Sequence, residues 1–324
     1  MTMADQDEYD GDIFIYRGGR APQHITHARI DTSVDELEEG AFRHCAHLEH
    51  VDTHDGLRRV GKFAFTGCRS LRRINLKSVV EIDICAFYYC GSLVGVEFGD
   101  RLETIGDSAF NQCTSIKHLK LPSIITIGKG AFHKCTSLTD IELPERLETI
   151  GASALKHCQH LQRIAIPLKR DLFEFDDSRQ KYNQFDNAKH VTTVDLVGGV
   201  HETVASLHME SWKCEMIAEI NRINQVLPNT HSSQKSDVIR QWMDSVMDKL
   251  HHYKAEHYRY VAEGITLLEL ALWKANLGEK EDNCEEGRTK KAKVDAESYR
   301  RNKRITCGAD MAIKNVLPFL KLEE

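Results

Sequence analysis

Alanine followed by phenylalanine recurs along the first half of the chain at intervals of 22 or 23 residues. The pairs are Ala41-Phe42, Ala64-Phe65, Ala86-Phe87, Ala109-Phe110 and Ala131-Phe132, and the sixth position reads Ala154-Leu155. A cysteine follows each pair at fixed spacing, namely Cys45, Cys68, Cys90, Cys113, Cys135 and Cys158. A single unit of this length cannot bury its apolar side alone, so the repeat predicts units that stack on one another.

One short segment of each unit alternates between apolar and polar residues. In residues 73–76 the alternation places Ile74 and Leu76 on one side of a strand and Arg73 and Asn75 on the other. The repeat therefore predicts a ladder of parallel strands. An Ile-Gly pair precedes several Ala-Phe pairs, as at Ile105-Gly106, and we expect a turn there because glycine tolerates a positive φ.

The pattern weakens at both ends of the repeat region. It extends over residues 25–200, which makes about seven coils, and Ile13–Tyr16 is the predicted N-terminal capping strand. The step from Leu155 to Phe185 is 30 residues, so about seven extra residues are expected to bulge from this coil, between Lys169 and Asn183.

Beyond residue 200 the apolar spacing changes to three and four, which predicts helices. The first runs over 204–227 and is stopped by Pro228. The second begins at Ser236-Asp237 after a linker and continues to Leu277, with Gly264 as a candidate bend. A third helical pattern covers 299–320.

The repeat unit, Ile-Gly-x-x-Ala-Phe-x-x-Cys-x-Ser-Leu-x-x-Ile-x-Leu-Pro, is nearly complete from Ile127 to Pro144. It resembles the BspA-like leucine-rich-repeat family over roughly residues 20–200. The helical remainder looks like the tails of repeat families expanded in microalgae. The resemblance implies a non-catalytic solenoid that binds other macromolecules, and some family members act as surface adhesins.

These observations predict an α+β protein in three parts. Residues 1–24 form a cap strand and lead-in, and 25–200 form a leucine-rich-repeat solenoid with a parallel strand ladder of about seven coils of 22–23 residues. Residues 201–324 form an all-α C-terminal domain.

The residues that could act in catalysis or metal binding are better explained by structural roles. Six cysteines share one column among apolar positions, so we expect small buried thiols and neither a metal site nor disulfides. His251, His252 and His257 are expected on a solvated helix surface, and a metal-dependent enzyme using this helix is the weakest hypothesis. The chain lacks a GxSxG nucleophile motif and a phosphate-binding loop. We therefore expect no enzyme and no cofactor.

The outward columns of the sheet are the candidate binding surface. Each coil of a solenoid adds one or two side chains to a continuous face, and here the charges alternate in sign, which suits a protein epitope. The candidate partner-binding residues are His50, Asp52, Arg73, Asn75, Glu97, His118, Lys120, Asp140, Glu142 and Arg163. The main hypothesis is a protein-protein interaction scaffold, and the alternative is a structural or adhesive repeat protein.

Composition limits the partner and the compartment. A net charge of -6 gives no reason to expect nucleic acid, and no apolar run is long enough for a membrane span. The acidic start lacks the features of a signal peptide, so an intracellular, cytoplasmic protein is expected. Basic clusters at 290–293 and 300–304 are a nuclear-import signal or a solvated helix face. The apolar segment 267–273 is either buried within the helical domain or a surface for self-association, and burial is favoured.

Overall fold

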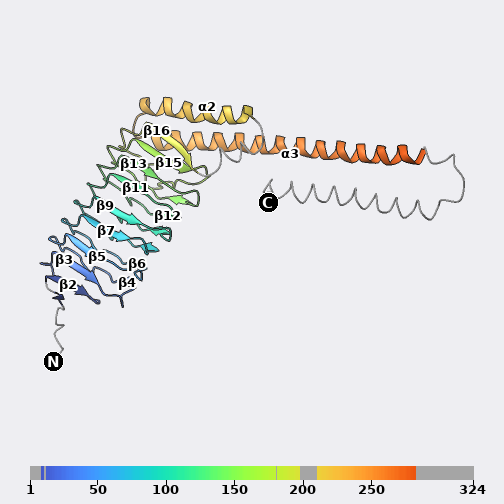
Figure 1. Ribbon diagram of the computed structural model, residues 1–324. Coiled ribbons are helices and arrows are strands. Elements are labelled where there is room, and N and C mark those ends of the chain that lie inside the picture. The colour runs from blue at the N-terminus through green and yellow to red at the C-terminus, as the bar shows by residue number, and fades with distance from the viewer. Residues whose placement is uncertain (1–8, 11, 180, 198–209, 282–324) are drawn as a thin grey trace, which may run out of the picture. The chain divides into compact units, whose positions relative to one another are not determined.

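The computed structural model describes residues 9–10, 12–179, 181–197 and 210–281 (Figure 1). The chain divides into two compact units, residues 1–257 and 258–324. The first contains the repeats and two helical segments that follow them. The predicted boundaries after residues 24 and 200 stay predictions.

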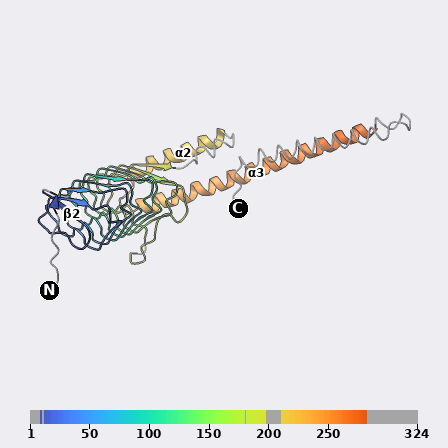
Figure 2. The same cartoon turned by 60° about the horizontal axis from the view of Figure 1, so that its bottom comes forward.

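Short parallel strands stack along the first unit in two ladders, which confirms the predicted solenoid (Figures 1 and 2). The outward-facing ladder is formed by β2 (Ile13–Tyr16), β3 (His27–Ile30), β5 (His50–Asp52), β7 (Arg73–Leu76), β9 (Gly95–Phe98), β11 (His118–Lys120), β13 (Asp140–Glu142), β15 (Arg163–Pro167) and β16 (Thr193–Val197). The second ladder is formed by β4 (Glu36–Leu37), β6 (Arg59–Val60), β8 (Glu81–Ile82), β10 (Thr104–Ile105), β12 (Thr126–Ile127) and β14 (Thr149–Ile150). Six turns carry both strands, and an isolated bridge between Ile150 and Phe173 extends the second ladder by one step.

The phenylalanines of the repeat form a continuous stack inside the solenoid. Rings of neighbouring coils lie 4.9 to 5.5 Å apart between centroids and are nearly parallel, with interplanar angles of 2 to 11°. All five rings are fully buried, and they are Phe42, Phe65, Phe87, Phe110 and Phe132. The column thus supplies the aromatic part of a single apolar core that runs through every coil.

The cysteine column is buried beside this stack, as predicted. Each thiol donates a hydrogen bond to a backbone carbonyl of the preceding coil, for example Cys113 Sγ to Phe87 O at 3.1 Å and Cys158 Sγ to Phe132 O at 3.2 Å. Burial raises the pKa of Cys158 to about 12 and that of Cys45 to about 11. These thiols therefore satisfy carbonyl groups and remain protonated at neutral pH.

Alkylation should distinguish these thiols from the exposed Cys214. At pH 8 we expect iodoacetamide to modify Cys214 readily and the six column cysteines about a thousandfold more slowly, because a buried thiol reacts only after local opening. Peptide mapping by mass spectrometry after timed alkylation measures each site separately. Similar rates at Cys113 and Cys214 would show that the coils open freely and would contradict this prediction.

The glycines before the Ala-Phe pairs correct one sequence expectation. Positive φ does not occur at Gly106, Gly128 or Gly151 but falls two residues later, for example at Ser108 with φ 55°. A Cβ at Gly151 would lie 2.5 Å from the carbonyl carbon of Gly128 in the preceding coil, which is closer than real Cβ atoms come. Glycine is thus required here because the backbones of adjacent coils approach one another, not because the turn is left-handed.

Two strands cover the first coil, and a loop contains the extra residues of the last coil. β1 (Tyr9–Asp10) pairs antiparallel with β2, and β2 pairs parallel with β3, so the predicted capping strand is confirmed. Tyr16 from β2 places its ring 4.9 Å from that of Phe42 and covers the first end of the stack. The extra residues lie where predicted, and Asp176 and Lys181 form an antiparallel bridge within them.

Two helical segments lie against the last coil. The helix α2 (Glu210–Val226) ends at a 3-10 turn, η1 (Leu227–Asn229), which contains Pro228, so the predicted stop is confirmed. The helix α3 (Lys235–Glu281) begins one residue before the predicted start. Trp242 of α3 donates its indole N–H to Glu219 O of α2 at 3.1 Å and joins the two helices. Apolar residues from both helices belong to the same core as the coils.

Polar side chains of these helices complete the backbone hydrogen bonds of the last coil. Asn224 accepts a hydrogen bond from Val194 N at 2.8 Å and donates one to Val194 O at 3.3 Å, so its amide takes the place of a further strand beside β16. Ser236 Oγ accepts from Phe185 N at 3.0 Å. The fully buried ammonium of Lys235 donates to Lys189 O and Val191 O. The helices therefore cap the open end of the solenoid.

The second unit begins within α3, which continues through Gly264 to Glu281, four residues beyond the predicted end. Leu268 is 53% exposed, so the predicted burial of segment 267–273 is wrong at this residue, and the side chains of Leu267, Leu270, Leu272 and Trp273 lie outside the described ones. The predicted third helix and both basic clusters also lie outside them. Among the described helices, none has an apolar stretch that could cross a bilayer.

Candidate functional site

The strand register places the predicted binding residues side by side on one face. His50 pairs with Arg73, and His118 pairs with Asp140, which in turn pairs with Arg163. Asn75 pairs with Glu97, and Lys120 with Glu142. Because the strands are parallel and in register, residues of equivalent repeat positions form straight columns. Ala165 pairs with Glu142 and follows it in the same column, but its side chain is buried.

Many charges on this face are neutralised by a neighbour. Arg163 pairs with Asp195 at 2.6 Å, Lys77 with Glu97 at 2.8 Å, and His118 contacts Asp140. The Lys77 ammonium, through its hydrogen bond and charge, lowers the pKa of Glu97. Arg73 also lowers this pKa through its charge, but it forms no salt bridge with any described residue.

The face is not uniform along the solenoid, because the outward ladder is interrupted once. One sheet of six strands ends at β9, and a separate sheet of four strands begins at β11. The apolar side chains Val96 and Phe98 of β9 are only partly buried, whereas the equivalent residues of β7 are buried. Val94, which precedes β9, is 47% exposed. The predicted surface thus includes partly exposed apolar side chains at β9, which could not be foreseen from the polar columns.

A hollow of about 420 Å³ lies over β5, β7 and β9. Its lining includes five of the ten predicted binding residues, which are His50, Asp52, Arg73, Asn75 and Glu97. The sequence explains the depression, since Gly95 stands in a column where every other coil has a side chain. A Cβ at Gly95 would be 3.6 Å from Arg73 Cγ, so the Arg73 side chain runs along the bare backbone. The other five predicted residues do not line this hollow.

The three histidines of α3 lie within one short stretch of the helix, residues 251–257. His251 and His252 are exposed, and His252 Nε2 lies 3.7 Å from Glu256 Oε1 one turn away. Within the described part of the chain, His, Cys, Asp and Glu side chains form no group of three or more that could hold a metal ion. The solvated surface predicted for the three histidines agrees with the exposure of His251 and His252, whereas His257 is half-buried and its Nε2 atom is buried.

Several polar residues around the last coil were not predictable from the columns. Sequence reasoning missed Asn224, Lys235 and Ser236, because their contacts join helical segments to backbone groups 30 to 51 residues away. It also missed the polar residues Asn183 and Gln184, which are fully buried beneath the extra residues of the last coil. A polar residue at an apolar repeat position, such as Gln184 in place of alanine, was the available signal.

Comparisons with known proteins place this surface in a family context. The sequence profile of the BspA type leucine rich repeat region matches at residues 21–125, 74–178 and 109–224, which together cover more than half of the chain. No curated protein matches the chain.

Solved structures of other leucine-rich-repeat proteins match part of the chain. A leucine-rich-repeat protein of T. pallidum is 26% identical, with a TM-score of 0.43, and the match covers 58% of this chain and 79% of that one. A leucine-rich-repeat protein from Bacteroides ovatus is 24% identical, with a TM-score of 0.35 and coverage of 53% and 61%. The pneumococcal vaccine antigen PcpA is 17% identical, with a TM-score of 0.33 and coverage of 54% and 51%. The chain therefore spans less than two thirds of the latter two.

Proposed function

The chain belongs to the BspA-type leucine-rich-repeat family, and from this premise we propose that it is a non-catalytic module that binds a partner protein over β5, β7 and β9. Proteins of this repeat family typically mediate protein interaction or adhesion and are generally not enzymes. The hollow that Gly95 leaves between charged side chains is the observation that carries the proposal.

The chemistry of the hollow suits a protein side chain better than a uniform charged polymer. Arg73 offers a bidentate donor for a carboxylate, while Asp52 and Glu97 beside it accept hydrogen bonds. The partly exposed Val94 adds an apolar contact. Protein interfaces typically have an apolar centre and a polar rim, and here charged side chains of both signs surround a small apolar area.

The backbone of this surface is held in place before any partner arrives. β7 pairs along its length with β9, and β5 pairs with β7, so the columns cannot shift independently. Binding to a rigid sheet requires ordering mainly of side chains, which lowers the entropic cost of association. A conformational change is not needed for this proposal.

Filling the hollow should abolish binding without unfolding the chain. Gly95→Tyr places an aromatic ring in the hollow, and the backbone tolerates it because φ at Gly95 is not positive and the nearest side-chain atom is 3.6 Å from a Cβ. Proximity labelling in the native cells compares the full-length protein with this variant and with Arg73→Glu. We expect a small set of labelled proteins to be lost by both variants.

Gly91→Tyr is the matched control, because Gly91 does not line the hollow and its Cβ would have only an ordinary contact, 3.7 Å from Thr114 Oγ1. It should keep the labelled set and, like Gly95→Tyr, the melting temperature of the unaltered protein. If all three variants retain the same labelled proteins, the face over β5, β7 and β9 is not the binding site.

A further inference from the structure

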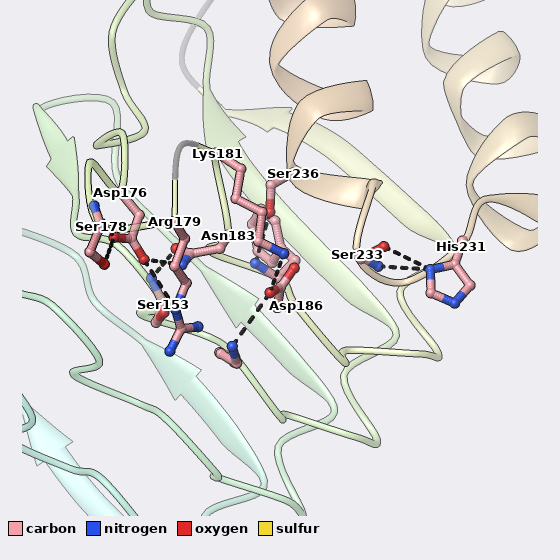
Figure 3. Close-up of polar contacts among 12 residues, drawn as sticks. Ser153, Asp176, Ser178, Arg179, Lys181, Asn183, Asp186, His231, Ser233 and Ser236 are labelled. Carbon is pink, nitrogen blue, oxygen red and sulfur yellow. Dashed lines mark hydrogen bonds and ion pairs between the residues drawn. The ribbon is translucent and has the colours of Figure 1, made fainter.

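The extra residues of the last coil fold into a polar loop above the coils that precede it (Figure 3). Asp176 organises this loop, since its carboxylate accepts hydrogen bonds from Ser178 N at 3.1 Å and Asn183 Nδ2 at 2.5 Å. Arg179 approaches the same carboxylate at 3.6 Å. The loop thus has an internal network that fixes its shape and does not depend on one contact.

The loop is also anchored to the coil beneath it. Asn183 Oδ1 accepts from Ser153 N at 2.8 Å, so one amide links Asp176 above to the backbone below (Figure 3). Asp186, only 8% exposed, receives the ammonium groups of Lys181 at 2.8 Å and Lys156 at 3.4 Å. These contacts hold the loop in a defined position on the coil beneath it.

A cavity of about 490 Å³, open to solvent, lies between this loop and the turn segments of three preceding coils. That volume is within the range of small-molecule sites, which are usually about 300–1,000 Å³. Lys129, Lys156 and Arg179 contribute positive charge to its lining, against the carboxylates of Asp176 and Asp177. Lys156 is paired with Asp186 and Arg179 lies beside Asp176, whereas Lys129 forms no salt bridge with any described residue.

Two neutral groups in the lining point to the rest of a ligand. The buried Oδ1 atom of Asn111 has no hydrogen-bond partner among the described residues, so it is an acceptor that a hydroxyl group would satisfy. Phe175 is 42% exposed at the same cavity and offers an apolar ring face or edge. An exposed aromatic ring beside polar groups is suited to the C–H face of a hydroxylated ring.

The protonation state of His133 depends on the charges around the cavity. Burial lowers its pKa to about 4, and the positive charges of His157, Lys134, Lys156 and Arg179 act in the same direction. Asp176, Asp177 and Asp186 are the carboxylates around this part of the cavity. The imidazole is therefore neutral at pH 7 and leaves the surrounding cations to an incoming anion.

We propose that this cavity binds a small hydroxylated monocarboxylate, that is, a sugar acid, with the carboxylate at Lys129 and Arg179 and a hydroxyl group at Asn111. One negative charge matches Lys129, the lining cation that forms no salt bridge with a described residue, whereas a phosphate dianion would exceed it. Phe175 packs against the sugar ring. The site lies apart from the β5–β9 face and is independent of the protein partner proposed there.

Isothermal titration of the full-length protein tests the chemistry directly. We expect glucuronate to bind at least about 10-fold more tightly than glucose, acetate or inorganic phosphate, because each lacks part of the matched set. Lys129→Gln should weaken glucuronate binding about 10- to 100-fold by removing a charged donor. Asn111→Ala should weaken glucuronate binding but leave the weak binding of acetate unchanged.

Lys62→Gln is the matched control, since Lys62 is exposed, follows a glycine as Lys129 does, and belongs to a coil that does not line the cavity. It should bind glucuronate as the unaltered protein does. A second readout is the proton NMR titration of His133, whose pKa should rise when glucuronate saturates the site. Absence of glucuronate binding, equal binding by Lys129→Gln, or tighter binding of phosphate would overturn the proposal.

Discussion

Phe110→Ala should lower the free energy of unfolding by about 3–5 kcal/mol, a range typical of removing a buried phenylalanine. Phe110 is fully buried between Phe87 and Phe132, with ring centroids 4.9 and 5.5 Å away, and Phe98 lies edge-on at 5.9 Å. The substitution removes three aromatic contacts and leaves a cavity in the middle of the stack. Because each coil is stabilised mainly by its neighbours, coils on both sides lose a packing surface.

The chain itself supplies the control for this prediction. Leu155 occupies the phenylalanine column in the sixth coil and is fully buried there, so the backbone of the unit accommodates leucine. Phe110→Leu should therefore cost only about 1–2 kcal/mol, since most of the volume is kept. Urea denaturation followed by circular dichroism measures both values. Equal destabilisation by leucine and alanine would mean that ring stacking, not filled volume, holds the column together.

The repeat could be read from the sequence because its stabilising contacts are periodic. Every coil uses the same apolar positions against the same positions of the next coil, so the periodic spacing encodes tertiary contacts. The Phe stack, the buried cysteines and the register of His50 with Arg73 all follow from the 22- or 23-residue step. The recurrence of glycine at 106, 128 and 151 was evident in the sequence, but the reason for it was not. The close approach of the backbones of two coils cannot be seen in the sequence of one repeat unit.

The candidate sites could be predicted only in part, since they depend on departures from the repeat. The outward columns contain His50 and Arg73, yet the hollow between them depends on the missing side chain at Gly95 and on the sheet boundary after β9. The second cavity depends on a loop whose length was evident but whose fold was not. Its shape comes from Asp176 and Asn183, two polar residues that carry no periodic signal.

The helical segments posed a different difficulty. Apolar spacing predicted α2 and α3, but it cannot identify which surface a helix covers. Asn224 and Ser236 determine that choice, because their side chains bond to the backbone of the last coil. A polar residue on the buried side of an amphipathic helix weakens the apolar periodicity. The residues that determine where the helices pack are therefore the ones that apolar spacing cannot identify.

Ile239→Asp should remove the helical cap and cost at least about 4 kcal/mol, because it buries a carboxylate without a partner. Ile239 is fully buried and follows Ser236 by three residues, so it lies on the face of α3 that bonds to the coil. Detaching the helices would also free Val194 N and O, now bonded to Asn224, and expose the unpaired edge of β16. An open edge of this kind pairs readily with another chain.

The expected result is therefore a lower melting temperature together with association, measured by differential scanning calorimetry and by light scattering after size-exclusion chromatography. Gln241→Asp is the matched control, because the same charge enters α3 two residues later on its exposed side. It should change neither property. Association of Ile239→Asp without a loss of stability would place the helices at a surface that prevents contact between chains but does not support the fold. An unchanged melting temperature and size would refute the capping role altogether, since a helix that completes the hydrogen bonds of the last coil cannot be displaced without cost.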